Sequence, residues 1–274
     1  MNRAPNQVEM GQPLRAQGRE LQSGFHVYER QRPEPNSTYE IVGNDFSQLI
    51  EFQVHPEEVI TCEPGTMVYM SPGMLPDIDM GDCSQGCKRC CCAGESMFRL
   101  HFKNEGDEVE RVAVTPSWPA QIIPIDLATY DGLIFNRGAF LAAIGDDWHV
   151  DIRTVRSVGI ACCAGQGVFM NTLHGQGMVF LCAGGTVMTK TLAAGEELVV
   201  EQQNILAFEK TVELGIRRFG GCLICCCGGQ GLFNAVLTGP GFVMIRTMPL
   251  SKLAMALRVQ GAQGGGGGGG GSAE

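Results

Sequence analysis

A short motif occurs three times in the chain, and it constrains the fold more than any other feature. Each copy reads two cysteines, a small residue, glycine, an acidic or amide residue, a small residue, an apolar residue and phenylalanine. The copies end 71 and 64 residues apart, a period that indicates repeated supersecondary units sharing one core. Three copies predict pseudo-threefold symmetry. Their glycines and phenylalanines are Gly94, Phe98, Gly165, Phe169, Gly229 and Phe233.

Short apolar runs separated by turn residues fill the chain around these copies and predict an antiparallel all-β domain. Leucines three to four residues apart after Pro249 predict one short C-terminal helix, 249–257. The apolar runs are Ser47–Val54, Thr66–Met70, Val109–Val114, Gln121–Ile125, Val168–Leu173, Met178–Leu181, Glu197–Val200, Val212–Ile216, Leu232–Leu237 and Phe242–Ile245.

The ends of the chain differ in composition from its middle. Residues 1–37 are rich in Gln, Pro, Arg and Asn and predict a disordered leader, and the glycine run in 261–274 predicts a flexible tail. The β domain is expected over 38–260, with internal repeats at about 38–115, 116–190 and 191–258.

The chain is acidic and has few charged residues. Its formal net charge is −9, with 18 % charged and 44 % apolar residues, and no basic stripe is present to attract phosphate, which argues against nucleic-acid binding. No apolar run approaches the ~18 residues of a membrane-spanning helix, and no secretory signal or clear transit peptide precedes the domain. The sequence therefore predicts an intracellular protein, cytoplasmic or at a membrane surface.

Six segments carry a resemblance to a known family: Glu63–Met70, Gly94–Phe98, Arg137–Ala142, Asn204–Glu209, Gly229–Phe233 and Leu237–Gly241. They resemble the altered-inheritance-of-mitochondria twenty-four family, also called tryptophan RNA-binding attenuator protein-like (TRAP-like). The resemblance covers about residues 39–258 and implies a β-prism of three sheets around a pseudo-threefold axis, related to the double-stranded β-helix. It implies no agreed catalytic residues, and a mitochondrial link only through fungal members associated with inner-membrane organisation.

Thirteen cysteines, many of them adjacent in the sequence, are interpreted as reduced thiols, because neighbouring cysteines rarely meet disulfide geometry. Cys62 and Cys182 stand alone in apolar runs and are expected in the core. The clusters occupy equivalent tips of the repeats and are predicted to contact a membrane or partner, either as apolar residues or through S-acyl chains. These clustered residues are Cys90, Cys91, Cys92, Cys162, Cys163, Cys225, Cys226 and Cys227.

A metal or redox site is the alternative use of these thiols, since soft thiolates suit zinc, copper(I) and iron–sulfur clusters. Its candidate ligands are the two Cys-x-x-Cys pairs, Cys87 with Cys90 and Cys222 with Cys225, which lack the flanking histidines or fixed spacing of zinc ribbons.

Residues typical of catalysis form no recognisable pattern. The histidines have no metal spacing, Asp146 and Asp147 after Gly145 predict a hairpin turn, and no phosphate-binding glycine motif precedes a helix. No cofactor or catalytic residue is therefore predicted. The sequence favours a non-catalytic scaffold or interaction module that forms homo-oligomers and docks a membrane or protein partner through its cysteine-bearing tips.

Overall fold

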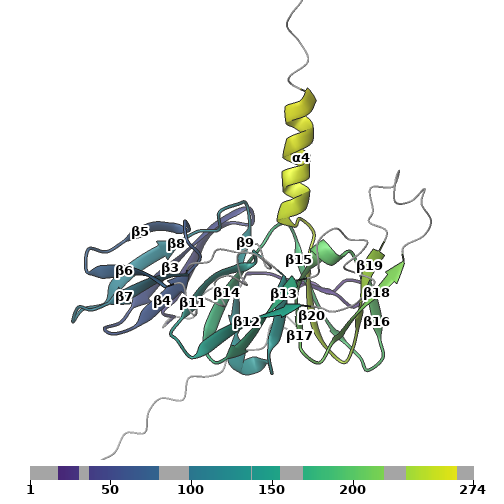
Figure 1. Ribbon diagram of the computed structural model, residues 1–274, viewed down its shortest axis with the longest axis horizontal. Helices are drawn as coiled ribbons and strands as arrows, with labels where there is room; N and C mark the ends of the chain where they lie inside the picture. The colour runs from purple at the N-terminus through teal and green to yellow at the C-terminus, as the bar shows by residue number, and fades with distance from the viewer. Residues whose placement is uncertain are drawn as a thin grey trace, which may run out of the picture.

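The structure is a computed structural model, and it describes residues 18–30, 37–79, 99–136, 138–154, 169–218 and 233–263. Within these residues the chain forms twenty strands and one α-helix, α4 (Leu250–Gln263), so the prediction of an all-β domain with a C-terminal helix is confirmed. Each of the ten predicted apolar runs overlaps a strand, and the other ten strands lie outside these runs. Figure 1 shows α4 projecting away from the sheets.

Two strands lie ahead of a regular series of eighteen: β1 (His26–Val27) and β2 (Tyr39–Asn44). The series falls into three groups of six. The first group is β3 (Ser47–Val54), β4 (Val59–Cys62), β5 (Met67–Met70), β6 (Met74–Asp79), β7 (Arg99–Asn104) and β8 (Glu110–Val114).

The second group also contains a 3₁₀ turn, η3 (Leu127–Thr129), and the third contains η4 (Gln202–Asn204). The second group is β9 (Gln121–Asp126), β10 (Leu133–Asn136), β11 (Phe140–Ile144), β12 (Trp148–Thr154), β13 (Phe169–Gly175) and β14 (Met178–Ala183). The third group is β15 (Val187–Leu192), β16 (Glu197–Val200), β17 (Ile205–Glu209), β18 (Glu213–Arg218), β19 (Phe233–Thr238) and β20 (Gly241–Arg246).

The three groups have the same strand pairing. In each, the first and third strands pair with the sixth, and the second and fourth strands pair with the fifth, always antiparallel. Successive groups are joined by the second strand of one and the third strand of the next. β4 pairs with β11, where Cys62 lies opposite Ala142, and β10 pairs with β17, where Phe135 lies opposite Ala207.

These pairings produce four sheets. Sheet I has the order β2-β3-β8-β5, sheet II β6-β7-β4-β11-β14-β9, sheet III β12-β13-β10-β17-β20-β15-β1, and sheet IV β18-β19-β16. Sheets II and III each combine three strands from one group with three from the next. Sheets I and IV, which lie at opposite ends of the molecule in Figure 1, contain strands from the first and third parts of the chain respectively.

Three hydrophobic cores lie between successive sheets, so the sheets are stacked in the order I, II, III, IV. Alternating apolar side chains of each strand supply these cores, because successive residues of a strand point to opposite faces. Each core combines side chains of two sheets: Phe52 and Phe180 belong to the first, Leu181 and Phe242 to the second, and Phe208 and Leu237 to the third.

Two segments differ from what their sequence predicts. Residues 18–30 belong to the predicted disordered leader, but their strand β1 pairs with β15 of sheet III. Phe25 and Tyr28 are both buried, and Tyr28 is part of the core between sheets II and III. Residues 145–147 link β11 of sheet II to β12 of sheet III, so the prediction of a hairpin there was wrong. Asp147 instead accepts a backbone hydrogen bond from Gln176 (3.0 Å).

Candidate functional site

The three cysteine-bearing segments connect equivalent strands. Residues 80–98, 155–168 and 219–232 each lie between the fourth and fifth strands of a group. The strands on either side of these segments are paired antiparallel, with Asp79 opposite Arg99, Thr154 opposite Phe169, and Arg218 opposite Phe233. The strands that flank each cysteine-bearing segment therefore form an antiparallel pair at a sheet edge.

Most of the predicted site residues lie in these segments, outside the described residues. Phe169 and Phe233 of the repeat motif are the first residues of β13 and β19, and Arg99, which follows Phe98, is the first residue of β7. The predicted residues outside the described part are Cys87, Cys90, Cys91, Cys92, Gly94, Phe98, Cys162, Cys163, Gly165, Cys222, Cys225, Cys226, Cys227 and Gly229.

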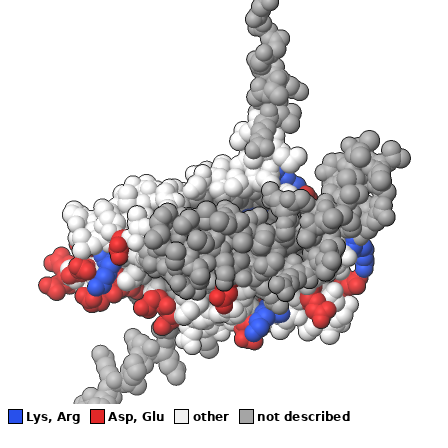
Figure 2. Space-filling view, viewed as in Figure 1, with Lys and Arg blue, Asp and Glu red and all other residues white. Residues whose placement is uncertain are grey.

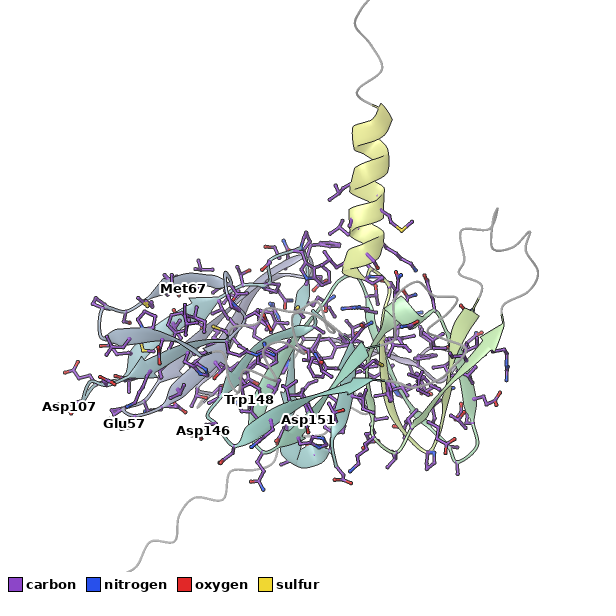
Figure 3. The ribbon with its side chains drawn as sticks, viewed as in Figure 1. Glu57, Met67, Asp107, Asp146, Trp148 and Asp151 are labelled. Atoms are coloured by element: carbon purple, nitrogen blue, oxygen red, sulfur yellow. The ribbon has the colours of Figure 1, made fainter. Side chains whose placement is uncertain are left out.

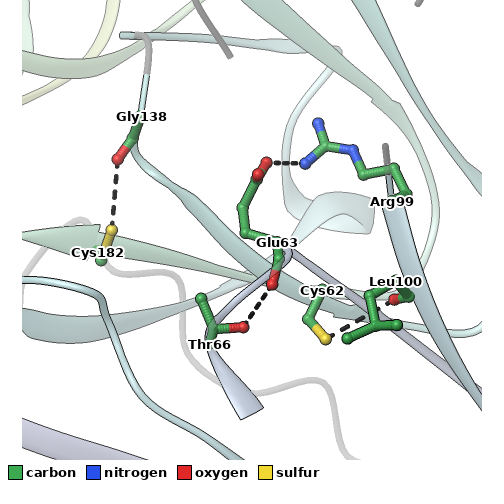
Figure 4. A network of polar contacts seen from close by, with 7 residues as sticks. All are labelled: Cys62, Glu63, Thr66, Arg99, Leu100, Gly138 and Cys182. Carbon is green, nitrogen blue, oxygen red and sulfur yellow. Dashed lines mark hydrogen bonds and ion pairs between the residues drawn. The ribbon is translucent and has the colours of Figure 1, made fainter. Parts of the chain in front are cut away.

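Arg99 starts a buried polar network at the base of the first cysteine-bearing segment (Figure 4). Its guanidinium is paired with the carboxylate of Glu63 and lies 4.2 Å from the ring centroid of Phe140. Glu63 is fixed by its own backbone, because its N–H donates to Leu141 (3.0 Å) and its carbonyl accepts from the Thr66 hydroxyl (2.6 Å). These contacts therefore connect the first strand group to β11 of the second strand group.

Sequence patterns did not identify this ion pair. Glu63 belongs to the segment Glu63–Met70 that carries the family resemblance, and Arg99 follows the repeated phenylalanine directly. The available signal was an arginine directly after the repeated phenylalanine, because a charge that is buried requires a partner.

The thiols of Cys62 and Cys182 lie in the same region and are buried, as predicted. The Cys62 thiol donates to the carbonyl of Leu100 (3.7 Å) and the Cys182 thiol to that of Gly138 (3.5 Å). Burial raises the pKa of each thiol to about 12. Both are therefore protonated at neutral pH, which suits packing and not nucleophilic attack, because the thiolate is the reactive species.

The described residues contain no group of three or more His, Cys, Asp or Glu side chains placed to hold a metal ion. One described histidine and one described aspartate have hydrogen-bond partners within the fold. His101 Nδ1 lies 2.9 Å from the Thr61 hydroxyl, and Asp126 accepts a hydrogen bond from the backbone of Ala128 (3.0 Å) at the start of η3.

The charged surface is mainly acidic, and its described cations are largely paired with acids. Figure 2 shows acidic side chains along one margin and end of the molecule, where Glu57, Asp107, Asp146 and Asp151 lie in Figure 3. Lys103 Nζ is 3.1 Å from Glu57, and other described pairs involve Arg111, Lys190, Lys210, Arg217 and Lys252. Such pairing leaves little free positive charge for phosphate on this surface.

Among the described residues, no helix combines the length and the apolar character needed to cross a membrane.

Comparison with known proteins identifies the family. A family model described as mitochondrial biogenesis AIM24 matches residues 39–248. The crystal structure of protein SPYM3_0169 from Streptococcus pyogenes is similar, with a TM-score of 0.64 and 22 % identity over 81 % of this chain and 98 % of that chain, which shows a shared fold. A search of curated proteins found no match. Because the family model covers most of the chain, the protein belongs to the mitochondrial biogenesis AIM24 family.

Proposed function

We propose that the protein is a non-catalytic scaffold of three TRAP-like β units, related to the double-stranded β-helix and arranged in a row instead of around the predicted threefold axis (Figure 1). The identical strand pairing of the groups supports this proposal. The protein serves mitochondrial biogenesis through binding, in the organisation of the inner membrane, and its copies associate with one another.

The cysteine-bearing segments are the proposed docking surface for a membrane or protein partner. The observation that carries this proposal is that all three segments join the fourth and fifth strands of their groups, so the repetition of the sheets is matched by repetition of the clusters. Repeated apolar residues at equivalent positions give several contacts at once, and a multivalent surface binds more tightly than any single contact. S-acylation would add ~0.8 kcal/mol of membrane binding for each buried methylene, and stable anchoring takes more than one chain.

Two sets of substitutions separate these modes of docking. Changing the eight clustered cysteines to serine removes both apolar character and thiols, whereas changing them to alanine removes only the thiols. Apolar contact predicts that the alanine variant stays in the membrane fraction and the serine variant leaves it, while acylation predicts that both leave. Membrane recovery that is the same for the parent and both variants would refute docking through these segments.

The second candidate function is a metal or redox role for the two Cys-x-x-Cys pairs. The observation that favours it is that the pairs lie in equivalent segments of the first and third groups. The four ligands would be Cys87, Cys90, Cys222 and Cys225. Elemental analysis of anaerobically purified protein separates the candidates. Metal at less than one equivalent, unchanged in the Cys87→Ser/Cys222→Ser variant, supports the scaffold, and stoichiometric metal lost in that variant supports the metal site.

A further inference from the structure

Two strands lack a neighbour that their equivalents have. The second strands β4 and β10 pair with the third strands β11 and β17 of the following groups. In the described part of the chain, the second strand of the last group, β16, and the third strand of the first group, β5, form no such pair and lie at sheet edges.

The two outer sheets are complementary halves of an inner sheet. Sheet II continues from the fourth, fifth and second strands of one group to the third, sixth and first strands of the next, and sheet III repeats this order. Sheet IV contains only the first half of the pattern, and sheet I contains only the second half with β2 added. Joining β16 to β5 would give the order β18-β19-β16-β5-β8-β3, which is that of sheet II.

Both edges are apolar and exposed where their equivalents are buried. In β5, Val68 is 48 % and Tyr69 45 % exposed, whereas every residue of β17 and the first four of β11 are buried. In β16, Val199 is 41 % exposed, although the corresponding residues Thr61 and Ile134 are buried. An apolar edge strand with unpaired backbone groups is a template for pairing with another chain.

The two edges lie far apart in one molecule. Figure 1 places β5 at one end and β16 at the other, and Figure 3 shows Met67 of β5 at the end away from the third group. The strand that completes each edge must therefore come from a different molecule, and a second copy of this chain supplies the strand that the repeated pattern requires.

We propose that copies of the chain associate head to tail, with β16 of one copy pairing antiparallel with β5 of the next. The inference deepens the self-association in the proposed function by naming its two surfaces, and it does not depend on the cysteine-bearing segments. Because the two surfaces differ, each added copy leaves one β5 and one β16 open, which gives a ring or an open chain of copies.

The pairing within the chain fixes the register between copies. Ile60, Leu133 and Leu198 occupy equivalent positions of the second strands, because they lie opposite Phe102, Leu173 and Leu237, each four residues after a repeated phenylalanine. Each third strand has a register shift in its pairing with the sixth strand of its group. The shift follows Met67 in β5, Phe140 in β11 and Ile205 in β17, so these three residues occupy equivalent positions.

This alignment predicts the contacts between copies. Thr61 lies opposite Ala143 and Ile134 opposite Phe208 at the two junctions within the chain, so Val199 should lie opposite Met70 of the next copy. Val200 should in the same way lie opposite Tyr69.

Sedimentation of the full-length chain under reducing conditions tests the proposal. The wild-type mass should rise above 29.4 kDa with concentration, and Val199→Lys or Met70→Glu should each return it to the monomer mass. The double variant should recover association, because lysine and glutamate then face each other. The control is Leu75→Lys on β6, because the Leu75 side chain is 50 % exposed. β6 is the fourth strand of its group, and the fourth strand lies at a sheet edge in all three groups, so β6 lacks no neighbour that its equivalents have. The Leu75→Lys variant should associate like the wild type.

A monomeric wild type, or association that neither edge variant changes, would overturn the proposal. Monomers whose β5 amides resist hydrogen exchange would also overturn it, because β5 would then pair within its own chain. Circular dichroism checks that each variant is folded. Failure of this test differs from failure of membrane docking, because the edge variants keep every cysteine and the cysteine variants keep both edges.

Discussion

Arg99 and Glu63 form a buried ion pair at the junction of the first two strand groups, with the Arg99 guanidinium also stacked on Phe140. The Arg99 side chain is 6 % exposed and that of Glu63 21 %. A charge removed from such a pair leaves its partner buried without compensation, which is more destabilising than the loss of the attraction itself.

Replacing one member of this pair should therefore destabilise the fold strongly. We expect Glu63→Gln to lower the free energy of unfolding by about 3 kcal/mol, the lower end for a buried pair because Glu63 keeps some solvent contact. The Glu63→Gln/Arg99→Met variant should be more stable than the sum of the single effects predicts, since it removes both charges. Urea unfolding measures the double variant and both single variants, Glu63→Gln and Arg99→Met.

The control is an exposed pair, Arg217 with Glu197, whose atoms approach to 2.5 Å. Arg217→Met should change stability by only ~0.2–1 kcal/mol, because solvent screens both charges. Equal effects at the two pairs would contradict the structural role assigned to Arg99.

Gly184 should not tolerate a side chain, because the chain that leads to α4 passes directly over it. A Cβ atom there would lie 2.4 Å from the carbonyl oxygen of Met248 and 2.4 Å from the ring of Trp118. We expect Gly184→Ala to reduce the free energy of unfolding by about 1–3 kcal/mol through overpacking. The matched change Gly215→Ala places Cβ 3.8 Å from its nearest neighbour and should not destabilise. Equal stability of the two variants would disprove the close approach.

The sequence predicted ten of the twenty strands of the described residues, because apolar runs and turn residues are local signals. It missed strands such as β6 and β12, in which polar residues interrupt the apolar run. It could not predict the order of the strands, which depends on contacts between distant parts of the chain, such as Ile134 opposite Phe208. Burial could not be read from hydrophobicity alone either. Met67–Met70 has the composition of a core strand but is exposed, because it is an edge strand with β8 on one side and no described strand on the other.

The candidate site was predicted in part. The repeated motif located three equivalent segments, because a repeat is visible in one sequence without any structure. The motif did not show that Arg99 needs Glu63, since the two residues meet only when β4 and β7 pair. Tyr28 was missed for a similar reason: its polar surroundings in the sequence indicate a leader, whereas its ring contributes to the core between sheets II and III.

Phe180 should be among the most sensitive core positions. It is fully buried, and its ring makes edge-to-face contacts with Phe52 (5.2 Å between centroids) and Tyr39 (4.8 Å). Phe180→Ala should lower the free energy of unfolding by about 3–5 kcal/mol, because it removes apolar contacts and leaves a cavity. Phe46→Ala is the control, since Phe46 is 70 % exposed and should change stability by less than ~0.5 kcal/mol. Similar losses in urea unfolding would contradict this packing.

The buried thiols should make the protein less stable in alkaline solution. Burial raises the pKa of Cys62 and Cys182 from an ordinary value of 9.0 to about 12. The folded state then holds protons that the unfolded state releases, so this contribution to stability is complete below pH 9 and is lost as pH rises from 9 towards 12. Each thiol should account for a loss of about 1 kcal/mol between pH 8 and 10. Urea unfolding at these two pH values measures the loss, which should be smaller in Cys62→Ala/Cys182→Ala. A variant that loses as much stability as the wild type over this interval would show that other groups cause the decline.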